Sequence, residues 1–546
     1  MKQKHMPSVA VALLDDQHTI WNAAFGMANL EDNIPAAADT VYKIWSVAKV
    51  FTAIETMRLV EEGSLDLDAP ISEYLPDFSI QSRFADPGTI TIRNILTQRS
   101  GLPRNGCTWV EHSPAELAGL AASLEHCYLA FPAETRYKYS NIGFDILGYL
   151  VEQERNQLFP FYVRDKLFTP IGMKNSAFLK EEIPDDLTIA LGYEYHKRDY
   201  YPLMQNDISS LPSGNLYATI DDMSEFIKLM FRAGNVNGEQ IIQPETLNRM
   251  VEKQASNPND PQRQGLGWKI APIFGSEQMI WHDGGPSEGI GALIALIPER
   301  KLGVILFANS THFDGSISAP LAVELLELML EAKYGLTAPE EIPPETEALD
   351  PAALARFEGR YIVFGEVMEI FLKGGKLKGK VMGLTFNLIP LDQHTFKLNN
   401  WLMRLGLDRL IPVPIDLRKL SFQFFAADAP EQDTMIINIG DISYEICPKV
   451  PDITDSLPYW ETITGSYELY TKQHSGHAGQ NAVGSTNITI EDGILHMSGF
   501  AGPLLPISET ELIIMSGSFV GETIRYDPET GHLHHQKFVF KKLTEN

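Results

Sequence analysis

The stretch Ser46-Val47-Ala48-Lys49 places a serine and a lysine three residues apart at the start of a helical pattern. One helical turn brings the Lys49 amine to the same face as the Ser46 hydroxyl. Unpaired N–H groups at a helix start also favour developing negative charge. A serine hydroxyl needs a neighbouring base to become a good nucleophile. The pattern therefore predicts an amphipathic helix from Val47 to about Gly63 that presents a nucleophilic serine, with apolar residues at helical spacing: Val50, Phe51, Ile54, Met57 and Val60.

A second motif, Tyr139-Ser140-Asn141, precedes a predicted helix from Gly143 to Glu152. A tyrosine beside the Lys49 ammonium would have a pKa below its usual value of about 10, and it would pass a proton to the leaving group. Asn141 would orient a substrate amide or ester. Read alone, however, the motif is more typical of a surface tyrosine followed by a helix-capping asparagine.

A third motif, His282-Asp283-Gly284-Gly285, follows the apolar residues 279–281 and precedes two predicted strands, Ile290 to Ile297 and Leu302 to Phe307. The small residues would allow a substrate backbone to lie against the strand. The Gly285 and Ser46 N–H groups would together form an oxyanion hole. Read alone, this motif is equally typical of a tight turn.

In this order, the three motifs resemble those of the serine beta-lactamase and penicillin-binding-protein superfamily, in particular its class C-like esterases and D-aminopeptidase-type hydrolases. The resemblance implies an α/β domain with an antiparallel sheet flanked by helices, in which Ser46 is acylated. It also implies that Lys49 and Tyr139 share the acid–base work and that Asn141, His282, Gly284 and Gly285 bind substrate. The resemblance extends from about residue 7 to 335. Within this range, further segments match the family in the same order: 63–68, 96–103, 170–173, 212–216 and 265–268.

Two departures from the family pattern bear on the substrate. True beta-lactamases and many D,D-peptidases carry Lys-Thr-Gly where this chain has His282-Asp283-Gly284. A histidine is mostly neutral at pH 7, so a substrate carboxylate would be held less firmly. This favours an ester or an aminoacyl amide over a beta-lactam. The second departure is Gln98-Arg99, where the family more often has His-Thr, and we interpret it as a change behind the catalytic groups.

The 546-residue chain is long enough for further domains after the hydrolase domain, which we assign to residues 1–335. Residues 336–350 are rich in proline and glutamate and predict a linker. Short alternating runs separated by glycine and aspartate predict antiparallel β-barrels over 351–450 and 451–546. A weak internal repeat relates them, because Phe357-Glu358-Gly359-Arg360-Tyr361 is matched by Trp460-Glu461 leading to Gly465-Ser466-Tyr467. Multidomain relatives of the D-aminopeptidase type also carry small β-barrels after the hydrolase domain.

Three stretches beyond the motifs leave alternatives open. The polar stretch Thr471 to Asn487 is either a surface loop or a segment that overhangs the cleft. The apolar stretch Asn400 to Leu420 would fill the first barrel or form a contact in a homo-oligomer. His532 with His534-His535 fits no standard zinc pattern, so we predict no metal and no cofactor.

Composition limits the partners and the compartment. The net charge of −27 argues against nucleic acid and anionic membrane surfaces, and no apolar run is long enough to cross a bilayer. Cys107 and Cys127 are either bridged to each other or both free, and free thiols are favoured unless the protein is exported; Cys447 stands alone. Relatives usually place a helix before the strand Ser8 to Leu14, so an upstream signal remains open, and with it the choice between a cytoplasmic and an exported protein.

The sequence thus predicts a serine hydrolase that forms an acyl-enzyme on Ser46. A peptidase or amidase, of the aminopeptidase or D-amino-acid-directed kind, is favoured over an esterase or a beta-lactamase-like hydrolase by the three-domain layout. The alternative from another class is a catalytically silent protein that binds acyl compounds.

Overall fold

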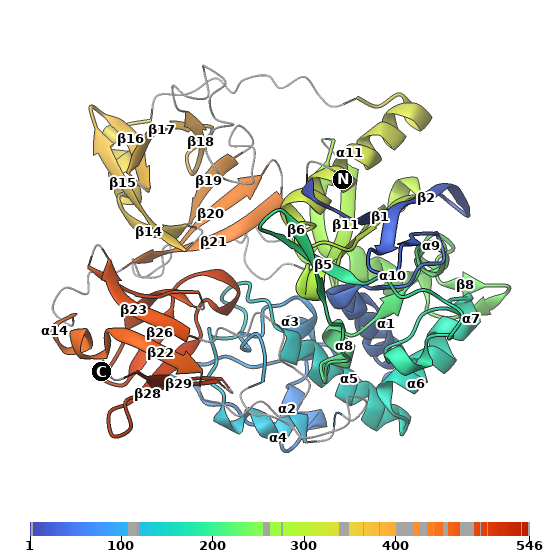
Figure 1. Cartoon of the computed structure of the whole chain (residues 1–546), viewed down its shortest axis with the longest axis horizontal. Helices are drawn as coiled ribbons and strands as arrows, with labels where there is room; N and C mark the ends of the chain where they lie inside the picture. Colours follow the sequence, from blue (N-terminus) through green and yellow to red (C-terminus); the bar gives the residue numbers. More distant parts are fainter. Residues whose placement is uncertain are drawn as a thin grey trace. The chain divides into compact units, whose positions relative to one another are not determined.

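The computed structural model describes residues 1, 4–106, 117, 119–254, 263–274, 277–337, 349–363, 365–381, 383–399, 420–425, 434–439, 442–450, 457–469, 485–491, 493–499, 501–536 and 538–543. The described residues up to 337 form one compact unit, and those from 349 onward form a second (Figure 1). Each unit has hydrophobic cores of its own.

The first unit is built on a seven-stranded antiparallel sheet in the order β10-β11-β12-β13-β1-β2-β3. Its strands are β1 (Ser8–Asp15), β2 (His18–Asn29), β3 (Ile34–Pro35), β10 (Lys269–Ile273), β11 (Glu277–Gly284), β12 (Gly291–Ile297) and β13 (Leu302–Ala308). The central strands β12 and β13 are buried along their whole length, as expected for strands covered on both faces. The sheet therefore joins the N-terminal strand to strands about 300 residues later, through pairs such as Val11 with Leu306.

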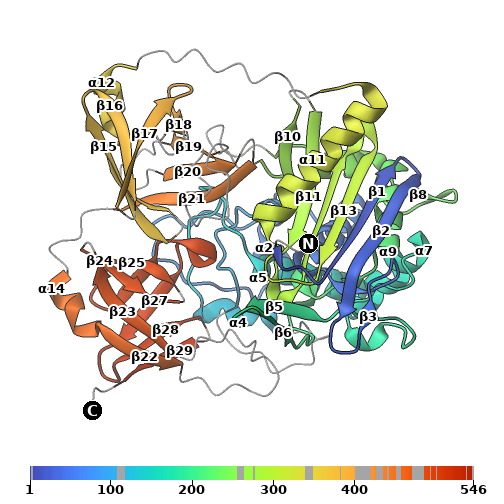
Figure 2. The ribbon, with the colours of Figure 1, turned by 45° about the horizontal axis from the view of Figure 1, so that its top comes forward.

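Helices cover both faces of this sheet. The helix α11 (Gly315–Tyr334) packs on β12 and β13 and lies across one face in Figure 2. On the other side, α9 (Ile220–Phe231) packs on β1 and β13, and α1 (Ala48–Glu61) packs on α5 (Asn141–Arg155) and α8 (Leu211–Gly214). The remaining α-helices of this unit are α2 (Ile71–Tyr74), α3 (Ile92–Leu96), α4 (Leu120–Ser123), α6 (Phe159–Val163), α7 (Thr169–Ile171) and α10 (Pro244–Val251). Three short two-stranded sheets pair β4 (Tyr42–Lys43) with β7 (Tyr217–Ala218), β5 (Gly192–His196) with β6 (Asp199–Leu203) and β8 (Asn235–Val236) with β9 (Glu239–Gln240).

The helix α1 differs from the expected amphipathic helix, because it is buried on nearly all sides. Four of its polar side chains, Lys49, Thr52, Glu55 and Thr56, are buried as well, and they have partners inside the protein. The Thr52 hydroxyl donates to the Pro212 carbonyl at 2.6 Å, and the Arg58 guanidinium donates to Glu55 at 2.9 Å. Such satisfied polar groups allow a helix with a polar face to lie inside the domain.

The second unit contains two closed eight-stranded antiparallel barrels. The first consists of β14 (Gly359–Val363), β15 (Glu366–Lys373), β16 (Lys376–Val381), β17 (Leu384–Pro390), β18 (Thr395–Asn399), β19 (Leu420–Phe425), β20 (Thr434–Ile439) and β21 (Ile442–Val450). The second consists of β22 (Gly465–Leu469), β23 (Ser485–Glu491), β24 (Ile494–Met497), β25 (Gly502–Pro506), β26 (Glu511–Ile514), β27 (Thr523–Asp527), β28 (His532–His535) and β29 (Phe538–Lys542). Short helices, α12 (Pro351–Leu354) and α14 (Leu457–Trp460), precede the two barrels. The predicted fold, an α/β domain with an antiparallel sheet followed by two β-barrels, is confirmed.

The weak sequence repeat corresponds to a repeated structural device at the start of each barrel. The Tyr361 hydroxyl donates to the Phe357 carbonyl at 3.2 Å, and the Tyr467 hydroxyl donates to the Ile463 carbonyl at 2.7 Å. In both barrels a glycine with positive φ, Gly359 or Gly465, lies against a lysine side chain of the closing strand. The two copies thus share a tyrosine that ties the first strand to the turn before it.

The remaining expectations concern the cysteines, the linker and two stretches of the barrel region. Cys127 is disulfide-bonded, so the expectation of a free thiol there is wrong, because sequence spacing does not report the separation that the fold gives to two thiols. Cys107 lies outside the described residues, and Cys447 is a buried thiol. Most of the expected linker 336–350, of the stretch 400–420 and of the stretch 471–487 also lies outside the described residues. In the part of the chain that the structure describes, no helix is long and apolar enough to cross a membrane.

Candidate active site

Ser46 lies in a single 3-10 turn, η2 (Trp45–Val47), directly before α1. The residue before it, Trp45, has a φ of 48°, a conformation that is uncommon for a residue with a side chain and that is found where surrounding structure enforces it. Its ring is held by Lys43, which is in turn paired with Glu288. The buried ammonium of Lys43 lies 4.0 Å from the centre of the Trp45 ring and 3.2 Å from the Glu288 carboxylate. Ser46 itself is half-buried, so it remains partly accessible in the middle of this turn.

Lys49, the second residue of α1, is fully buried, and its Nζ lies 3.2 Å from the Ser46 Oγ. The same Nζ lies 2.8 Å from Asn141 Oδ1 and 2.6 Å from the Ser213 carbonyl oxygen. Burial holds the pKa of Lys49 well below its usual range, because desolvation disfavours the charged form. The structure therefore brings together the expected serine and lysine in the geometry of a nucleophile and its base.

Tyr139 joins the pair from the segment before α5. The centre of its ring lies 4.8 Å from Lys49 Nζ, and its hydroxyl has a hydrogen bond with Ser46. The expectation of a lowered pKa is wrong. Shielding from water raises the pKa of Tyr139 and outweighs the nearby Arg104 cation and the bond to Ser46. Tyr139 is thus a protonated phenol, suited to donate a proton rather than to act as a phenolate base.

Asn141 is the first residue of α5, whereas sequence analysis expects it on the loop before that helix. The helix cap is Ser140, whose hydroxyl accepts from the Gly143 N–H at 3.1 Å. This frees the Asn141 side chain from capping. Its Oδ1 accepts from Lys49 and its Nδ2 donates to Asn105 Oδ1 at 3.0 Å, so the reading of the motif as a surface tyrosine and a capping asparagine is excluded.

Gln98, one of the two departures from the family pattern, supports this motif from behind. It is buried with a φ of 58°, and its Oε1 accepts from the Ser140 N–H at 2.7 Å. Its carbonyl also accepts from the Lys138 N–H at 2.7 Å. The side chain therefore holds the backbone between Tyr139 and Asn141, which agrees with its interpretation as a change behind the catalytic groups.

His282 lies within β11, not in a turn, and it is buried. Burial and the Lys269 cation lower the pKa of His282 to about 3, so the ring is neutral at pH 7. Its Nδ1–H donates to the Asp283 carbonyl at 2.9 Å, which leaves Nε2 as an acceptor. The Asp283 carboxylate accepts from Lys269 at 2.5 Å, and this neighbouring cation holds the pKa of Asp283 below its usual value even though burial raises it.

The two glycines after Asp283 have different surroundings. A Cβ on Gly284 would lie 2.2 Å from the Ile44 carbonyl oxygen, whereas a Cβ on Gly285 would meet nothing within 4 Å. Gly284 therefore allows β11 to approach the backbone two residues before Ser46. Gly285 is half-buried and leaves space beside this contact.

Sequence reasoning missed two contributors, Asp145 and Ser213. Ser213 belongs to the family-like segment 212–216, but its spacing gives no sign that its carbonyl would reach Lys49. Asp145 is a buried acid in an otherwise apolar helix face, and its N–H partner lies 68 residues away on α8. An acid within the apolar pattern of this helix, at helical spacing from Asn141, was the available signal, since acids are seldom buried without a partner.

Comparison with known proteins identifies the family of this chain. The family described as Beta-lactamase matches residues 1–327, more than half of the chain. The chain belongs to the Beta-lactamase family. It has the beta-lactamase fold, and Ser46, Lys49, Tyr139, Asn141 and His282 all lie inside the part that matches.

Three similar proteins illustrate the range of this family. The unguisins hydrolase ungD' of Aspergillus campestris is 26% identical over 60% of this chain and 63% of its own length. The octameric penicillin-binding protein homologue of Pyrococcus abyssi is 24% identical, with a TM-score of 0.54 over 82% of this chain and 96% of that one. The D-amino acid amidase of Ochrobactrum anthropi SV3, complexed with L-phenylalanine amide, is 21% identical, with a TM-score of 0.50 over 61% of this chain and 96% of that one. The chain spans less than two thirds of the length of the curated relatives it matches.

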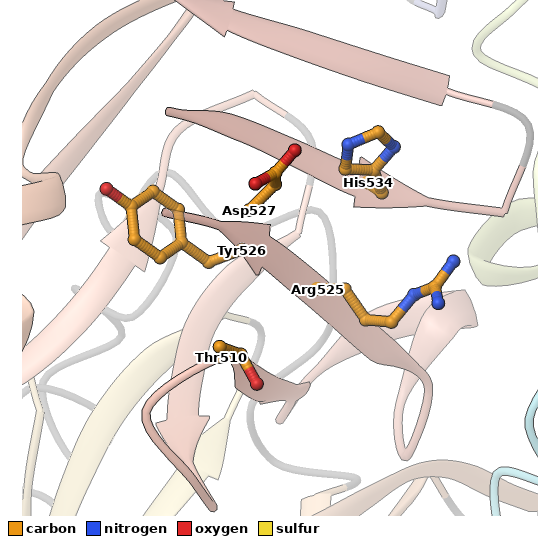
Figure 3. A pocket seen from close by; sticks show the side chains of 5 residues that line it. All are labelled: Thr510, Arg525, Tyr526, Asp527 and His534. Carbon is orange, nitrogen blue, oxygen red and sulfur yellow. The ribbon is translucent and has the colours of Figure 1, made fainter. Parts of the chain in front are cut away.

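The second barrel carries a cavity of about 300 Å³ that is lined by Thr510, Arg525, Tyr526, Asp527 and His534 (Figure 3). The Asp527 carboxylate is engaged by the turn that follows, because it accepts from the Thr530 hydroxyl at 2.6 Å. His535, next to His534, is buried and lies 3.1 Å from Glu522. Among the described residues, no group of three His, Cys, Asp or Glu side chains is placed to hold a metal ion.

Proposed function

We propose that this protein is a serine hydrolase that acylates Ser46 and acts as a peptidase or amidase. The observation that carries the proposal is the 3.2 Å separation between Ser46 Oγ and the Nζ of the fully buried Lys49. An amine with a depressed pKa is a base at neutral pH, and a serine hydroxyl within reach of such a base is a competent nucleophile.

The acylation step follows from this arrangement. Ser46 Oγ attacks the carbonyl carbon while its proton moves to Lys49 Nζ. The oxyanion is stabilised by the N–H groups of Ser46 and Gly285, beside the close contact between Gly284 and Ile44. When the C–N bond breaks, the Tyr139 phenol donates its proton to the leaving nitrogen and regains one from Lys49. Water then attacks the acyl carbon in the reverse sense, giving the acid and free Ser46.

The neutral His282 favours a substrate with an N–H or ammonium group over one with a carboxylate. With Nδ1–H bound to the Asp283 carbonyl, the ring offers only an acceptor, which suits an N–H or ammonium group of a substrate. The nearby Lys269 is paired with Asp283 at 2.5 Å, so its charge is largely compensated. A substrate carboxylate would therefore find weak support here. We infer an aminoacyl amide or short peptide, including D-aminoacyl compounds, in agreement with the similarity to a D-amino acid amidase.

The remaining assignments are proposals of the same kind. We propose that residues 1–335 carry the reaction, that 336–350 link them to the first barrel, and that 351–450 and 451–546 form separate barrel domains. The similar penicillin-binding protein homologue is octameric, and we propose that this chain also forms a homo-oligomer. The substrate partners are small peptides, amides or esters.

The test is turnover of a matched panel by the full chain and its Ser46→Ala variant. The panel contains L- and D-aminoacyl nitroanilides, a short-chain nitrophenyl ester and a chromogenic cephalosporin. Ser64→Ala serves as the control, because Ser64 is an exposed serine beyond the end of α1. We expect Ser46→Ala to lower nitroanilide turnover on the order of a thousandfold or more and Ser64→Ala to leave it unchanged.

The outcomes separate the alternatives. Turnover of the ester alone would make the protein an esterase, and turnover of the cephalosporin alone would make it a beta-lactamase. Turnover of nothing, with an unchanged affinity of Ser46→Ala for an aminoacyl amide, would indicate a binding protein. Mass spectrometry of acid-quenched reactions provides the direct check, because an acyl adduct must form on the wild type and be absent from Ser46→Ala.

A further inference from the structure

Asp145 lies one helical turn after Asn141, on the same face of α5, and is 2% exposed. Its Oδ1 accepts from the Ser213 N–H at 3.1 Å, and its carboxylate also has hydrogen bonds with the side chains of Ser213 and Ser210. A buried carboxylate that gathers hydrogen bonds from one segment fixes the position of that segment. Asp145 therefore anchors α8, the short helix that contains Ser213, to α5.

The helix α8, which Asp145 anchors, supplies one of the hydrogen-bond acceptors of Lys49, the proposed base. The Ser213 carbonyl lies 2.6 Å from Lys49 Nζ, and Asn141 Oδ1 lies 2.8 Å from it. A neutral amine has two N–H donors and one lone pair. If these two close acceptors take the two N–H groups, the lone pair is left for the third neighbour, the Ser46 Oγ at 3.2 Å. The carbonyl of Ser213 thus decides which way the amine points.

We propose that Asp145 is a positioning residue for Lys49, which holds Ser213 so that the lysine amine is directed at the Ser46 hydroxyl. This inference rests on the proposed function and adds a residue to it. Asp145 touches neither Ser46 nor the substrate position, and it acts through the backbone of α8.

The charge of Asp145 has a second effect on the same amine. Burial lowers the pKa of Lys49, and the Asp145 carboxylate opposes that shift. Burial raises the pKa of Asp145 itself to about 6, so the carboxylate is charged above that pH. The two groups titrate as a pair. The pH at which activity falls on the acidic side of the profile therefore reflects both groups together. The other groups that face Lys49 are Arg104, Lys269, Asp283, His282 and the Tyr139 phenol.

The experiment separates charge from hydrogen bonding at position 145 in the full chain. Asp145→Asn keeps an oxygen acceptor for the Ser213 N–H but removes the charge, whereas Asp145→Ala removes both. Glu152→Gln is the matched control. Glu152 is also a buried carboxylate of α5, and it accepts from the backbone N–H of Phe159 at 3.1 Å, away from Lys49. The readouts are kcat and kcat/KM of Ser46-dependent ester or nitroanilide turnover from pH 5 to 10, with thermal unfolding as a check of folding.

We expect the acidic limb of Asp145→Asn to move to lower pH by about one unit, because loss of a nearby negative charge makes Lys49 easier to deprotonate. Asp145→Ala should in addition lose about tenfold or more in kcat, since the Ser213 carbonyl is released. Glu152→Gln should keep the wild-type profile. If Asp145→Asn does not fold, Asp145→Ser supplies a short uncharged acceptor and the same shift is expected.

Two results would overturn the inference. One is an Asp145→Ala variant that folds and keeps the kcat of Asp145→Asn, and the other is an equal shift of the acidic limb in Glu152→Gln. Both leave the proposed function standing, provided that Ser46→Ala is inactive. Retained turnover in Ser46→Ala would instead remove the proposed function, so the two failures are distinguishable.

Discussion

Gly284 of β11 and Ile44, two residues before the nucleophile, lie so close that a Cβ on Gly284 would be 2.2 Å from the Ile44 carbonyl oxygen. The contact joins the strand that carries His282 to the turn that carries Ser46. Because the obstacle would be backbone and not a flexible side chain, neither partner can move aside without displacing the site.

A Gly284→Ala substitution should therefore lower both stability and activity. We expect a loss of about 1–3 kcal/mol in the free energy of unfolding, as for other overpacked sites, and a fall in kcat because η2 is displaced. Denaturant unfolding measures the first effect and ester turnover the second. Gly285→Ala is the matched control for stability, because its Cβ would meet nothing within 4 Å. Equal stabilities of the two variants would contradict the role assigned to the Gly284 contact.

Removal of the Tyr139 hydroxyl should affect substrates according to their leaving groups. Tyr139→Phe lacks the proton donor, so amide turnover should fall about a hundredfold or more. A nitrophenyl ester should lose much less, because nitrophenolate departs without being protonated. Tyr149→Phe is the control, because Tyr149 is a tyrosine of α5, the helix that follows Tyr139. The same loss on both substrates would show that Tyr139 acts earlier, in the attack by Ser46.

His282 should make stability depend on pH. Its pKa in the folded protein is about 3, below the unfolded value of 6.5, so between these values the unfolded state binds more protons. This contribution to stability is fully present above pH 6.5 and is lost as the pH falls toward 3. Unfolding of the wild type and of His282→Gln, compared from pH 4 to 8, measures it. The wild type should lose more stability on acidification, whereas parallel curves would mean that His282 is not held neutral.

The repeated tyrosines of the barrels should be equivalent in energy. Tyr361→Phe and Tyr467→Phe each remove a buried hydrogen bond to a carbonyl four residues earlier, and each should cost about 0.5–1.5 kcal/mol. Chemical unfolding followed by tryptophan fluorescence detects the loss. Ser46-dependent ester turnover should remain at the wild-type level. A large loss for one tyrosine alone would show that the repeat in sequence is not a repeat in energetics.

Local patterns in the sequence predicted much of the fold. The strand from Ser8, the helix from Ala48, the helix through Gly143 and the strands around 290–308 are all present within a few residues of their expected bounds. These elements have strong periodicity, and such patterns report local structure well. The alternation of short strands and turns after residue 350 likewise predicted two barrels. Local patterns did not predict that α1 would be buried on nearly all sides. The partners of its polar side chains, such as the Pro212 carbonyl, come from distant segments of the chain.

The sequence by itself determined which residue types the candidate site contains, because the order of the three motifs identifies Ser46, Lys49, Tyr139, Asn141 and His282. Only the tertiary structure decided their electrostatic states. Burial raises the pKa of Tyr139 against the expectation, keeps His282 neutral and lowers the pKa of Lys49. The tertiary structure also brought Asp145 and Ser213 into the site. Asp145 contacts Ser213 across 68 residues of sequence, and Ser213 contacts Lys49 across 164. The physical reason is that desolvation and through-space charge depend on what surrounds a group in three dimensions, and neighbours in space are not neighbours along the chain.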